Sequence, residues 1–509
     1  MPGRSLFELL RSRFPEDPEA VFLEHERGVL RYAEAEALSA RHAAVLAGAG
    51  VEAGDRVLVQ VAKSPEAVAL YLACLRLGAV FVPLNPAYTA AELEYFIADS
   101  EPRAVICAPS RAGETGALLA PGTVLLTLGP EGEGTLSDRA REAAPHVGST
   151  PRGGGDLAAI LYTSGTTGRS KGAMLSHDNL ASNALTLHEI WRFRPGDVLL
   201  HALPIFHVHG LFVALHCAML NGSRVIFQSR FDVDALVARL PDATVLMGVP
   251  TFYTRLLEHP GFGRESCANM RLFISGSAPL LPETFARFEQ RTGRRILERY
   301  GMTETGMITS NPCDGERIAG TVGFPLPGVR VRVADGEGRE LPRGAVGMLE
   351  VAGPNVFAGY WKMPERSAAE FRPDGWFITG DLAVMDEAGR VSIVGRAKDV
   401  VISGGYNIYP KEVEEALDRL EGVRESAVIG LPEPDLGEAV VAVVVPEGQS
   451  APDPEALREA LRGRLAGFKV PKRVVLRDAL PRNAMGKVQK NLLREELGAL
   501  LAGGAGAKG

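Results

Sequence analysis

The sequence has few cysteines, no excess of positive charge and no long apolar run. Its five cysteines are spread through 509 residues without a CxxC or CxH pair, which argues against a metal cage or a disulfide framework and favours a reducing compartment. Lys and Arg total 55 against 62 Asp and Glu, a net charge of -7, so neither nucleic acid nor an anionic membrane is expected as a partner. No run reaches the ~18 apolar residues of a membrane span, and the first residues lack the apolar segment of a signal peptide. We expect a cytoplasmic protein.

The composition that remains is that of a globular protein, with 46% hydrophobic and 23% charged residues, and the length suggests several domains. Short β-rich runs alternate with helical patterns in the first 250 residues. "DRVLVQV" precedes the helical "SPEAVALYLACLRLGA", and "VFVPL", the helical "TAAELEYFIADS" and "AVICA" follow. Strand, helix and strand with short connections are typical of βαβ units and a mainly parallel sheet. The predicted fold class is α/β.

Two changes in composition and secondary-structure pattern divide the chain. Near residue 312 the sequence turns to β segments punctuated by Gly and Pro, which predict a small β-barrel or an antiparallel sheet. Beyond Lys398 the pattern reads helix, strand, strand, helix, strand, a compact α+β unit. We therefore predict an N-terminal domain over residues 1–397 with a β-rich subdomain at 312–397, a mobile C-terminal domain at 398–500, and a disordered Gly/Ala-rich tail at 501–509.

A loop with the composition of a phosphate site lies in "ILYTSGTTGRSKGAMLSH", residues 160–177. An apolar strand leads into Ser, Thr and Gly residues, then Lys171 and an expected helix. Small residues let backbone N–H groups and hydroxyls close on phosphate oxygens, and the lysine adds charge. The loop is not a Walker motif, because Gly172 stands where Ser or Thr is needed. The alternative is a flexible surface loop.

This loop and four further segments resemble the adenylate-forming superfamily, which includes acyl-CoA synthetases, adenylation domains and luciferases. The segments are "YTSGTTGRSKG", "RYGMTET", "GWFITGDLA", "GRAKDVVISGGYNIYPKEVE" and "PRNAMGKVQK", in the family's order over nearly the full length. The resemblance implies a large N-terminal domain, a hinge and a mobile C-terminal domain. It also implies ATP, Mg²⁺ and coenzyme A: the acid attacks the α-phosphate, pyrophosphate leaves, and the CoA thiolate displaces AMP from the acyl-adenylate.

The resemblance also implies the site residues. Tyr300 packs on adenine, Asp381 accepts the ribose hydroxyls, and Thr303 bonds the α-phosphate. Glu304 binds Mg²⁺ together with Thr163, since a carboxylate suits a hard cation. The implied ATP contacts are Thr163, Ser164, Gly165, Thr166, Thr167, Gly168, Lys171, Gly276, Ser277, Ala278, Glu298, Tyr300, Gly301, Asp381 and Arg396.

The C-terminal part carries a second set of implied roles. Lys487 is the catalytic lysine, alongside Thr303 and Glu304, and bridges the acid and the α-phosphate. Lys398 is the hinge, where one residue's backbone angles absorb a domain rotation. After that rotation, the segment Ser403, Gly404 and Gly405 lines the pantetheine tunnel. A lysine acetyltransferase is a further candidate partner, because acetylation of Lys487 would remove its charge.

The residues expected around the acid are unusual for the family. "LPIFHVHGLF" places His207 and His209 beside the pocket, Met302 follows the adenine tyrosine, and Arg299 stands where relatives with large apolar substrates often have glycine. Arg255 is three residues from Phe252 and is expected on the same inward helix face. Buried arginines need an anion, so Arg255 and Arg299 together predict recognition of a second carboxylate.

These phrases resemble the malonyl-CoA synthetases, which activate malonate and often methylmalonate. The sequence leaves alternatives open. The acid could be another small one, such as oxalate or a short fatty acid, with Arg299 paired internally, for example to Glu298. An enzyme that loads a carrier protein and a non-enzymatic binding module are the alternatives of different chemistry.

Overall fold

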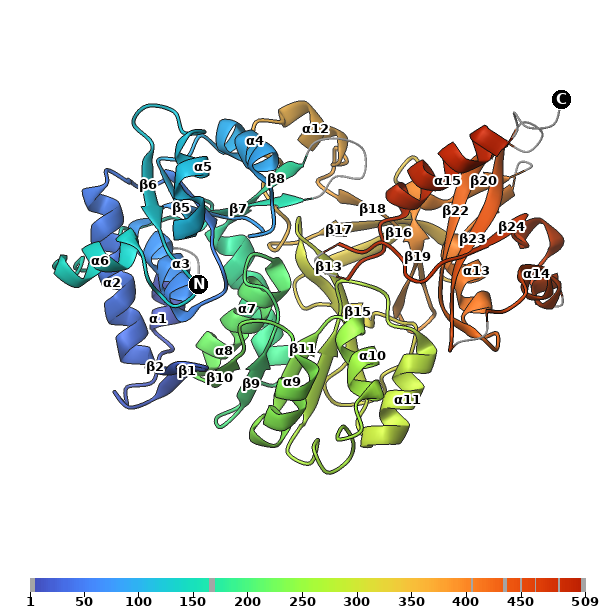
Figure 1. Ribbon diagram of the computed structural model, residues 1–509, viewed down its shortest axis with the longest axis horizontal. Coiled ribbons are helices and arrows are strands. Elements are labelled where there is room, and N and C mark those ends of the chain that lie inside the picture. Colours follow the sequence, from blue (N-terminus) through green and yellow to red (C-terminus); the bar gives the residue numbers. More distant parts are fainter. Residues whose placement is uncertain are drawn as a thin grey trace.

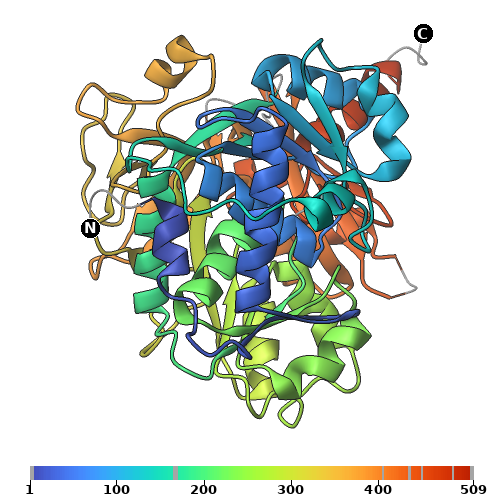
Figure 2. The ribbon, with the colours of Figure 1, turned by 90° about the vertical axis from the view of Figure 1, so that its left-hand side faces the viewer.

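The computed structural model describes residues 5–163, 170–403, 406–433, 437–448, 451–462, 464–483 and 486–504. In Figure 1 two α/β lobes, blue and green, lie side by side, and the C-terminal unit, orange and red, lies beyond an antiparallel sheet at their edge. The N-terminal helices α1 (Leu6–Arg11) and α2 (Tyr32–Gly48) form the outer surface at the opposite end (Figure 2). No helix in the described ranges is both long enough and apolar enough to cross a membrane.

The first sheet is mainly parallel. In spatial order its strands are β6 (Val124–Thr127), β5 (Ala104–Cys107), β3 (Arg56–Gln60), β4 (Val80–Pro83), β7 (Leu157–Thr163) and β8 (Lys171–Ser176). Only the last pairing among the described residues, β7 with β8, is antiparallel. The connections carry α3 (Pro65–Leu77), α4 (Ala90–Ser100), η1 (Pro109–Arg111), α5 (Ala112–Gly116) and α6 (Thr135–Glu142). Strands 56–60, 80–83 and 104–107 with helices 65–77 and 90–100 confirm the predicted βαβ pattern.

The second sheet has a parallel centre and antiparallel edges. Its order is β15 (Phe324–Pro325), β14 (Gly306–Ser310), β13 (Ile296–Met302), β12 (Leu272–Ser275), β11 (Val245–Gly248), β9 (Val198–His201), β10 (Arg224–Phe227), β1 (Val21–His25) and β2 (Gly28–Arg31). Its helices are α7 (His177–Ile190), the π-helical η2 (His209–Leu215), α8 (His216–Asn221), α9 (Val233–Arg239), η3 (Leu240–Asp242), α10 (Pro250–Glu258) and α11 (Pro282–Thr292). One large apolar core, which includes most residues of helix α3, joins both sheets. The predicted α/β class is confirmed.

The β-rich region forms an antiparallel sheet of order β16 (Arg330–Ala334), β17 (Val346–Ala352), β18 (Phe377–Met385) and β19 (Val391–Arg396), with α12 (Pro364–Ala369) inserted. Among the described residues β16 and β19 do not pair with each other, and an antiparallel bridge joins Val391 of β19 to Gly323 before β15. The sequence allowed a barrel or an antiparallel sheet, and these four strands are antiparallel neighbours. Burial alternates along β18, with one face packed on a core and the other partly open.

The C-terminal unit follows η4 (Ala397–Asp399), so the predicted boundary at 397/398 lies within that turn. It contains β20 (Val401–Ser403), β21 (Tyr406–Ile408), α13 (Pro410–Leu417), β22 (Val423–Glu433), β23 (Gly437–Pro446), α14 (Pro454–Arg462), η5 (Gly467–Lys469), β24 (Arg473–Leu476) and α15 (Lys490–Gly504). Two apolar clusters of its own lie on the two faces of its sheet. Helix α15 continues to Gly504 and so includes the first residues of the predicted tail at 501–509; residues 505–509 lie outside the described residues.

Candidate active site

The carboxyl ends of neighbouring parallel strands gather the predicted site. β11 ends at Gly248 before α10, β12 ends at Ser275 before Gly276, and β13 carries Tyr300 at its end. Ligands of open α/β sheets bind at this edge, where backbone groups and the loops after the strands are free to face them. The segments "VPTFYTR", "SGSAPL" and "RYGMTET", distant in sequence, are therefore adjacent.

The predicted phosphate loop joins β7 to β8. Ser164, Gly165, Thr166, Thr167 and Gly168 lie outside the described residues. Thr163 ends β7, and its hydroxyl donates to the carbonyl of Lys171 at 3.5 Å. The helix expected directly after Lys171 is wrong: Lys171–Ser176 is a strand, and α7 begins after it, capped by the Ser176 hydroxyl. Residues 173 and 175 face the core, the period of a strand.

Lys171 is held beside the expected metal ligand. Its ammonium lies 3.0 Å from Oε1 of Glu370 and 4.0 Å from the ring centre of Tyr360. The Tyr360 hydroxyl lies 2.6 Å from Oε2 of Glu370 and 3.0 Å from Oε1 of Glu304. A network of four side chains therefore links the lysine of the phosphate loop to Glu304.

Glu304 fits a magnesium ion that arrives with ATP. Its side chain is buried, and burial raises the pKa of its carboxyl. In the described ranges no three His, Cys, Asp or Glu side chains are grouped as metal ligands. Mg²⁺ in nucleotide sites is held by one or two carboxylates, water and substrate phosphates rather than by a protein cage. One hard oxygen ligand at the phosphate side of the pocket has this chemistry.

The residues predicted to lie around the ribose are joined by a hydrogen bond and an ion pair. The Tyr300 hydroxyl donates to Oδ2 of Asp381 at 2.5 Å, and the Arg396 guanidinium lies 2.7 Å from Oδ1. Burial, followed by the charge of Asp381, raises the pKa of Tyr300, so the phenol stays a donor. A Cβ on Gly301 would lie 2.1 Å from the carbonyl oxygen of Gly306, so only glycine permits this hairpin.

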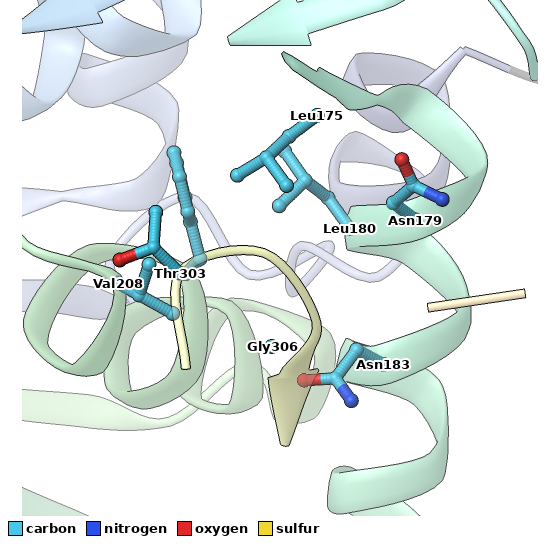
Figure 3. Close-up of a pocket in the computed structure, with 8 residues that line it drawn as sticks. Leu175, Asn179, Leu180, Asn183, Val208, Thr303 and Gly306 are labelled. Carbon is cyan, nitrogen blue, oxygen red and sulfur yellow. The ribbon is translucent and has the colours of Figure 1, made fainter. Parts of the chain in front are cut away.

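Thr303 lies in the turn between β13 and β14. Asn183 holds this turn from α7, donating to the Met307 carbonyl at 2.9 Å and accepting from its N–H at 3.0 Å, and Asn355 donates to the Thr305 carbonyl at 2.7 Å. Figure 3 shows Thr303 and Asn183 beside a small, largely apolar cavity of about 10 Å³, room for about one water molecule. The turn that carries Thr303 and Glu304 is therefore rigidly supported.

Arg299 is a buried cation without an acidic partner. Its side chain is 2% exposed, and among the described residues Nε and Nη2 have no hydrogen-bond partner. Burial lowers the pKa of Arg299 to about 9. Its guanidinium lies against Gly276, where an added Cβ would be 2.4 Å from Nη1. Glycine at 276 leaves the space that the guanidinium occupies.

The alternative in which Arg299 pairs with Glu298 is wrong. Successive residues of a strand point to opposite faces, and the Glu298 carboxylate accepts from the N–H of Leu280 at 3.4 Å instead. Burial raises the pKa of Glu298 to about 7. Its predicted contact with ATP stays a prediction.

Two neutral histidines line the same region. Burial and the charge of Arg299 lower the pKa of His207 to about 4 and hold that of His209 well below its usual range. Nδ1 of His209 lies 3.3 Å from the hydroxyl of Ser277. Ser277 has a φ of 71°, a strained value for a residue with a side chain, so its backbone is held in a set direction. Ala278 and Met302 are half-buried nearby.

The predicted burial of Arg255 is wrong. In α10 the buried face is formed by Phe252, Tyr253, Leu256 and Leu257, and Arg255 is exposed, 5.7 Å from the Phe231 ring centre. Arg255 shares a face with Thr251, one helical turn away. A Cβ on Gly486 would lie 3.1 Å from the Thr251 hydroxyl. Thr251 on this face of α10 therefore meets the C-terminal domain, and Arg255 is exposed one helical turn away.

Lys487 enters the cleft from the C-terminal domain. Its N–H donates to Oδ1 of Asn483 at 3.0 Å, which fixes the turn. Burial and the charge of Arg396 lower the pKa of Lys487, and the carboxylates of Asp381 and Glu304 act against that change. The side chain of Lys487 is exposed, and its contact with the acid and the α-phosphate stays a prediction.

Contacts at the hinge hold this arrangement. Lys398 lies in η4, and burial with the charge of Arg396 lowers its pKa to about 8. Its neighbour Asp399 lies 2.7 Å from the guanidinium of Arg494 on α15, and Lys411 donates to the Ile393 carbonyl at 2.6 Å. Ser403 is buried at the end of β20; Gly404 and Gly405 lie outside the described residues.

A model of the AMP-binding enzyme family matches residues 10–361, and a model of the AMP-binding enzyme C-terminal domain matches residues 412–487. The chain belongs to the AMP-binding enzyme family. Both matched segments contain site residues described above, with the hinge between them.

The AMP-binding enzyme is similar to MatB from Rhodopseudomonas palustris at 54% identity over 98% of this chain and 99% of that one. The TM-score is 0.96 for the ATP-bound crystal structure and 0.83 for the apo crystal structure. A feruloyl-CoA synthase of an Amycolatopsis species is 39% identical, covering 94% of this chain and 96% of the relative. A mitochondrial malonate–CoA ligase of Mus musculus is 38% identical, covering 82% and 78%. The whole-chain similarity is therefore higher to the ATP-bound crystal structure than to the apo one.

The AMP-binding enzyme is therefore an adenylate-forming CoA ligase, which uses ATP, Mg²⁺ and coenzyme A to join an acid to a thiol. The sequence analysis missed Tyr360 and Glu370. The phrase "GYWKMPERSAAEF" contains both, and an aromatic hydroxyl followed ten residues later by an acid was the available signal. Nothing local in that phrase connects it to Glu304.

Proposed function

We propose that this enzyme ligates malonate to coenzyme A through malonyl-adenylate, releasing AMP and pyrophosphate. The observation that carries the proposal is Arg299, a buried guanidinium without a carboxylate partner in the described part of the chain. A cation in such a position is costly unless an anion joins it. A dicarboxylate supplies that anion while its other carboxylate remains free to react.

The chemistry of the residues assigned to the acid pocket fits a short dicarboxylate. The planar guanidinium fork suits a carboxylate, with two parallel donors. His207 and His209 are neutral at pH 7 because burial and Arg299 depress their pKa values, so they offer hydrogen bonds without a competing charge. Arg255 is proposed as a second anion contact from the cleft side, and Met302 and Ser277 as the residues that meet a methyl group of methylmalonate.

The proposed adenylation centre lies beside this pocket. The reacting carboxylate and the α-phosphate are both anionic, so positioning and electrostatic relief are the main requirements. We assign Thr303 to the α-phosphate, Glu304 to Mg²⁺, and Lys487 to the carboxylate and α-phosphate together. Asp381 and Arg396 bind the ribose, and Tyr300 packs on adenine against Gly276, Ser277 and Ala278.

For the second half of the reaction, we propose rotation at Lys398 and passage of pantetheine along the segment 403–405. An ion pair at the hinge supports a separate arrangement for each half-reaction, because Arg494 of α15 binds Asp399, the neighbour of Lys398. Acetylation of Lys487 and a cytoplasmic location stay predictions.

The relatives support malonate without agreeing on it: one bears the name malonate–CoA ligase and another feruloyl-CoA synthase. Ferulate is large and aromatic, and a buried guanidinium facing it would lack an anion. The remaining alternatives are methylmalonate, another small acid such as oxalate, a short fatty acid, and a carrier-protein substrate in place of CoA.

AMP release separates these alternatives. The enzyme is incubated with ATP, Mg²⁺ and CoA and one acid at a time: malonate, methylmalonate, oxalate, succinate, propionate, butyrate or ferulate. Malonate or methylmalonate is expected to give the highest kcat/KM, at least tenfold above propionate, which lacks the second carboxylate. Equal rates with propionate would reject the proposal, and release that requires a carrier protein instead of CoA would reject the thiol assignment.

A further inference from the structure

Tyr360 stands between two acidic groups of the active site. It follows β17 in the chain, is 2% exposed, and packs its ring edge-on to Phe357 at 4.9 Å. Its hydroxyl lies 3.0 Å from Oε1 of Glu304 and 2.6 Å from Oε2 of Glu370. Both distances are those of hydrogen bonds. A phenol has one proton, so it donates to one carboxylate at a time.

The surroundings keep the ring in this position independently of the hydroxyl. The N–H of Tyr360 donates to the Ser367 hydroxyl at 2.8 Å, and the Lys171 ammonium lies over the ring. The N–H of Phe357 donates to the backbone carbonyl of Glu304 at 2.8 Å. The loop that carries Tyr360 is thus fastened to the backbone of Glu304, and its hydroxyl then meets the carboxylate.

Glu370 has enough positive partners to remain ionised without Tyr360. Lys171 lies 3.0 Å from its Oε1, and Arg366 lies 2.7 Å from the same oxygen. Among the described residues Glu304 forms no ion pair with a cation, and the Tyr360 hydroxyl lies 3.0 Å from its Oε1. Of the two acceptors, Glu304 therefore depends more on the phenol for its orientation.

We propose that Tyr360 is a positioning residue for Glu304: its hydroxyl holds the carboxylate in the orientation that binds the Mg²⁺ of MgATP, and Glu370 links this pair to Lys171 of the phosphate loop. The proposal rests on the assigned role of Glu304 but not on the identity of the acid. Partners that orient metal ligands typically change metal affinity by ~10–100-fold when removed.

The test compares ATP binding with and without metal, in the absence of acid and CoA so that no turnover occurs. Calorimetry gives the Kd of ATP in saturating Mg²⁺ and in EDTA. The Kd in EDTA divided by the Kd in Mg²⁺ measures how much the metal strengthens ATP binding. Tyr360→Phe keeps the ring and removes the hydroxyl. It is expected to reduce this ratio about tenfold while the Kd in EDTA stays within about threefold of the wild type.

Three variants accompany this measurement. Glu304→Gln is expected to reduce the ratio at least as much, and Tyr360→Phe in that background to add no further loss, because the phenol acts through Glu304. Tyr32→Phe removes an equally buried phenol, bonded to the Ser223 carbonyl at 2.7 Å far from the site, and should leave the ratio unchanged. Glu370→Gln weakens only the link to Lys171 and should reduce the ratio less than Tyr360→Phe does; an equal or larger loss would place the orienting role on Glu370 and overturn the proposal.

An unchanged ratio in Tyr360→Phe overturns the proposal. A loss of ATP affinity that is equal in Mg²⁺ and in EDTA also overturns it, because such a loss indicates a structural role. A ratio unchanged in Glu304→Gln overturns the metal assignment itself and so the proposal with it. Should Tyr360→Phe fail to fold, Tyr360→Met, which also removes the hydroxyl and leaves a flexible apolar side chain, takes its place with the same two Kd values and the same expected and contradicting results.

Discussion

Replacing Arg299 by methionine should make the enzyme more stable and less able to use malonate. The pKa of Arg299 falls from 12.5 to about 9 through burial, which makes its charged form less favourable in the folded protein by about 5 kcal/mol. Methionine fills a similar volume without charge. Because exchanges of buried charges for apolar residues stabilise by ~1–4 kcal/mol, we expect Arg299→Met to raise the melting temperature by a few degrees.

Arg299→Met is expected to lower activity with malonate although it raises stability. Losing a charge-assisted bidentate pair costs ~1.5–3 kcal/mol, so kcat/KM for malonate should fall about tenfold to several-hundredfold. The value for propionate should change little, and the Kd of ATP should stay near the wild-type value. Thermal unfolding and AMP release measure the two effects on one preparation.

Arg271→Met is the matched control. Arg271 is partly buried and pairs with Asp197, its Nε lying 2.7 Å from Oδ1, so its loss leaves a buried carboxylate without its cation. Here we expect a lower melting temperature and unchanged selectivity between malonate and propionate. The reasoning would be refuted if Arg299→Met destabilised the protein as Arg271→Met does, or if malonate and propionate lost activity in proportion.

Three further predictions follow from the site and the hinge. Lys487→Ala should abolish acid-dependent ATP–pyrophosphate exchange yet still convert supplied acyl-adenylate with CoA, and equal loss of both steps would reject its role. Glu298→Gln should remove a pH dependence of stability, because burial raises the pKa of this carboxyl from 4.5 to about 7. The wild-type free energy of unfolding therefore falls as pH rises from 4.5 to 7. At pH 8 the variant should be the more stable protein by about 3 kcal/mol, measured by urea unfolding. Arg494→Ala removes the 2.7 Å ion pair with Asp399 and should slow pyrophosphate exchange severalfold with little change in thioester formation; an unchanged exchange rate would show that the pair does not hold the adenylation arrangement.

The sequence predicted the fold because its elements leave local patterns, and the nucleotide residues assigned from the motifs stay predictions. Alternating strand and helix segments marked the parallel sheets, and small-residue motifs marked the turns after the strands. Arg299 was predicted to need an anion, and its burial without an acidic partner in the described residues agrees with the charge arrangement expected there.

Arg255 shows where local reasoning failed. Helical spacing tells which residues share a face of the helix, but the spacing between Arg255 and Phe252 alone did not identify which face of α10 is buried. The apolar set 252, 253, 256 and 257 forms a stripe that leaves residues 251 and 255 outside, and that pattern was readable. Tyr360 and Glu370 were not predictable in this way, since their partners Glu304 and Lys171 lie 56 and 199 residues away in sequence.

Direct competition tests the central claim, that Arg299 recognises a second carboxylate. Equal concentrations of malonate and propionate are given to the wild-type enzyme with limiting CoA, and the two thioesters are quantified by mass spectrometry, so that their ratio equals the ratio of kcat/KM. Malonyl-CoA in at least tenfold excess, falling towards equality in Arg299→Met, is the predicted result. Propionyl-CoA in equal or greater amount with the wild-type enzyme would contradict it.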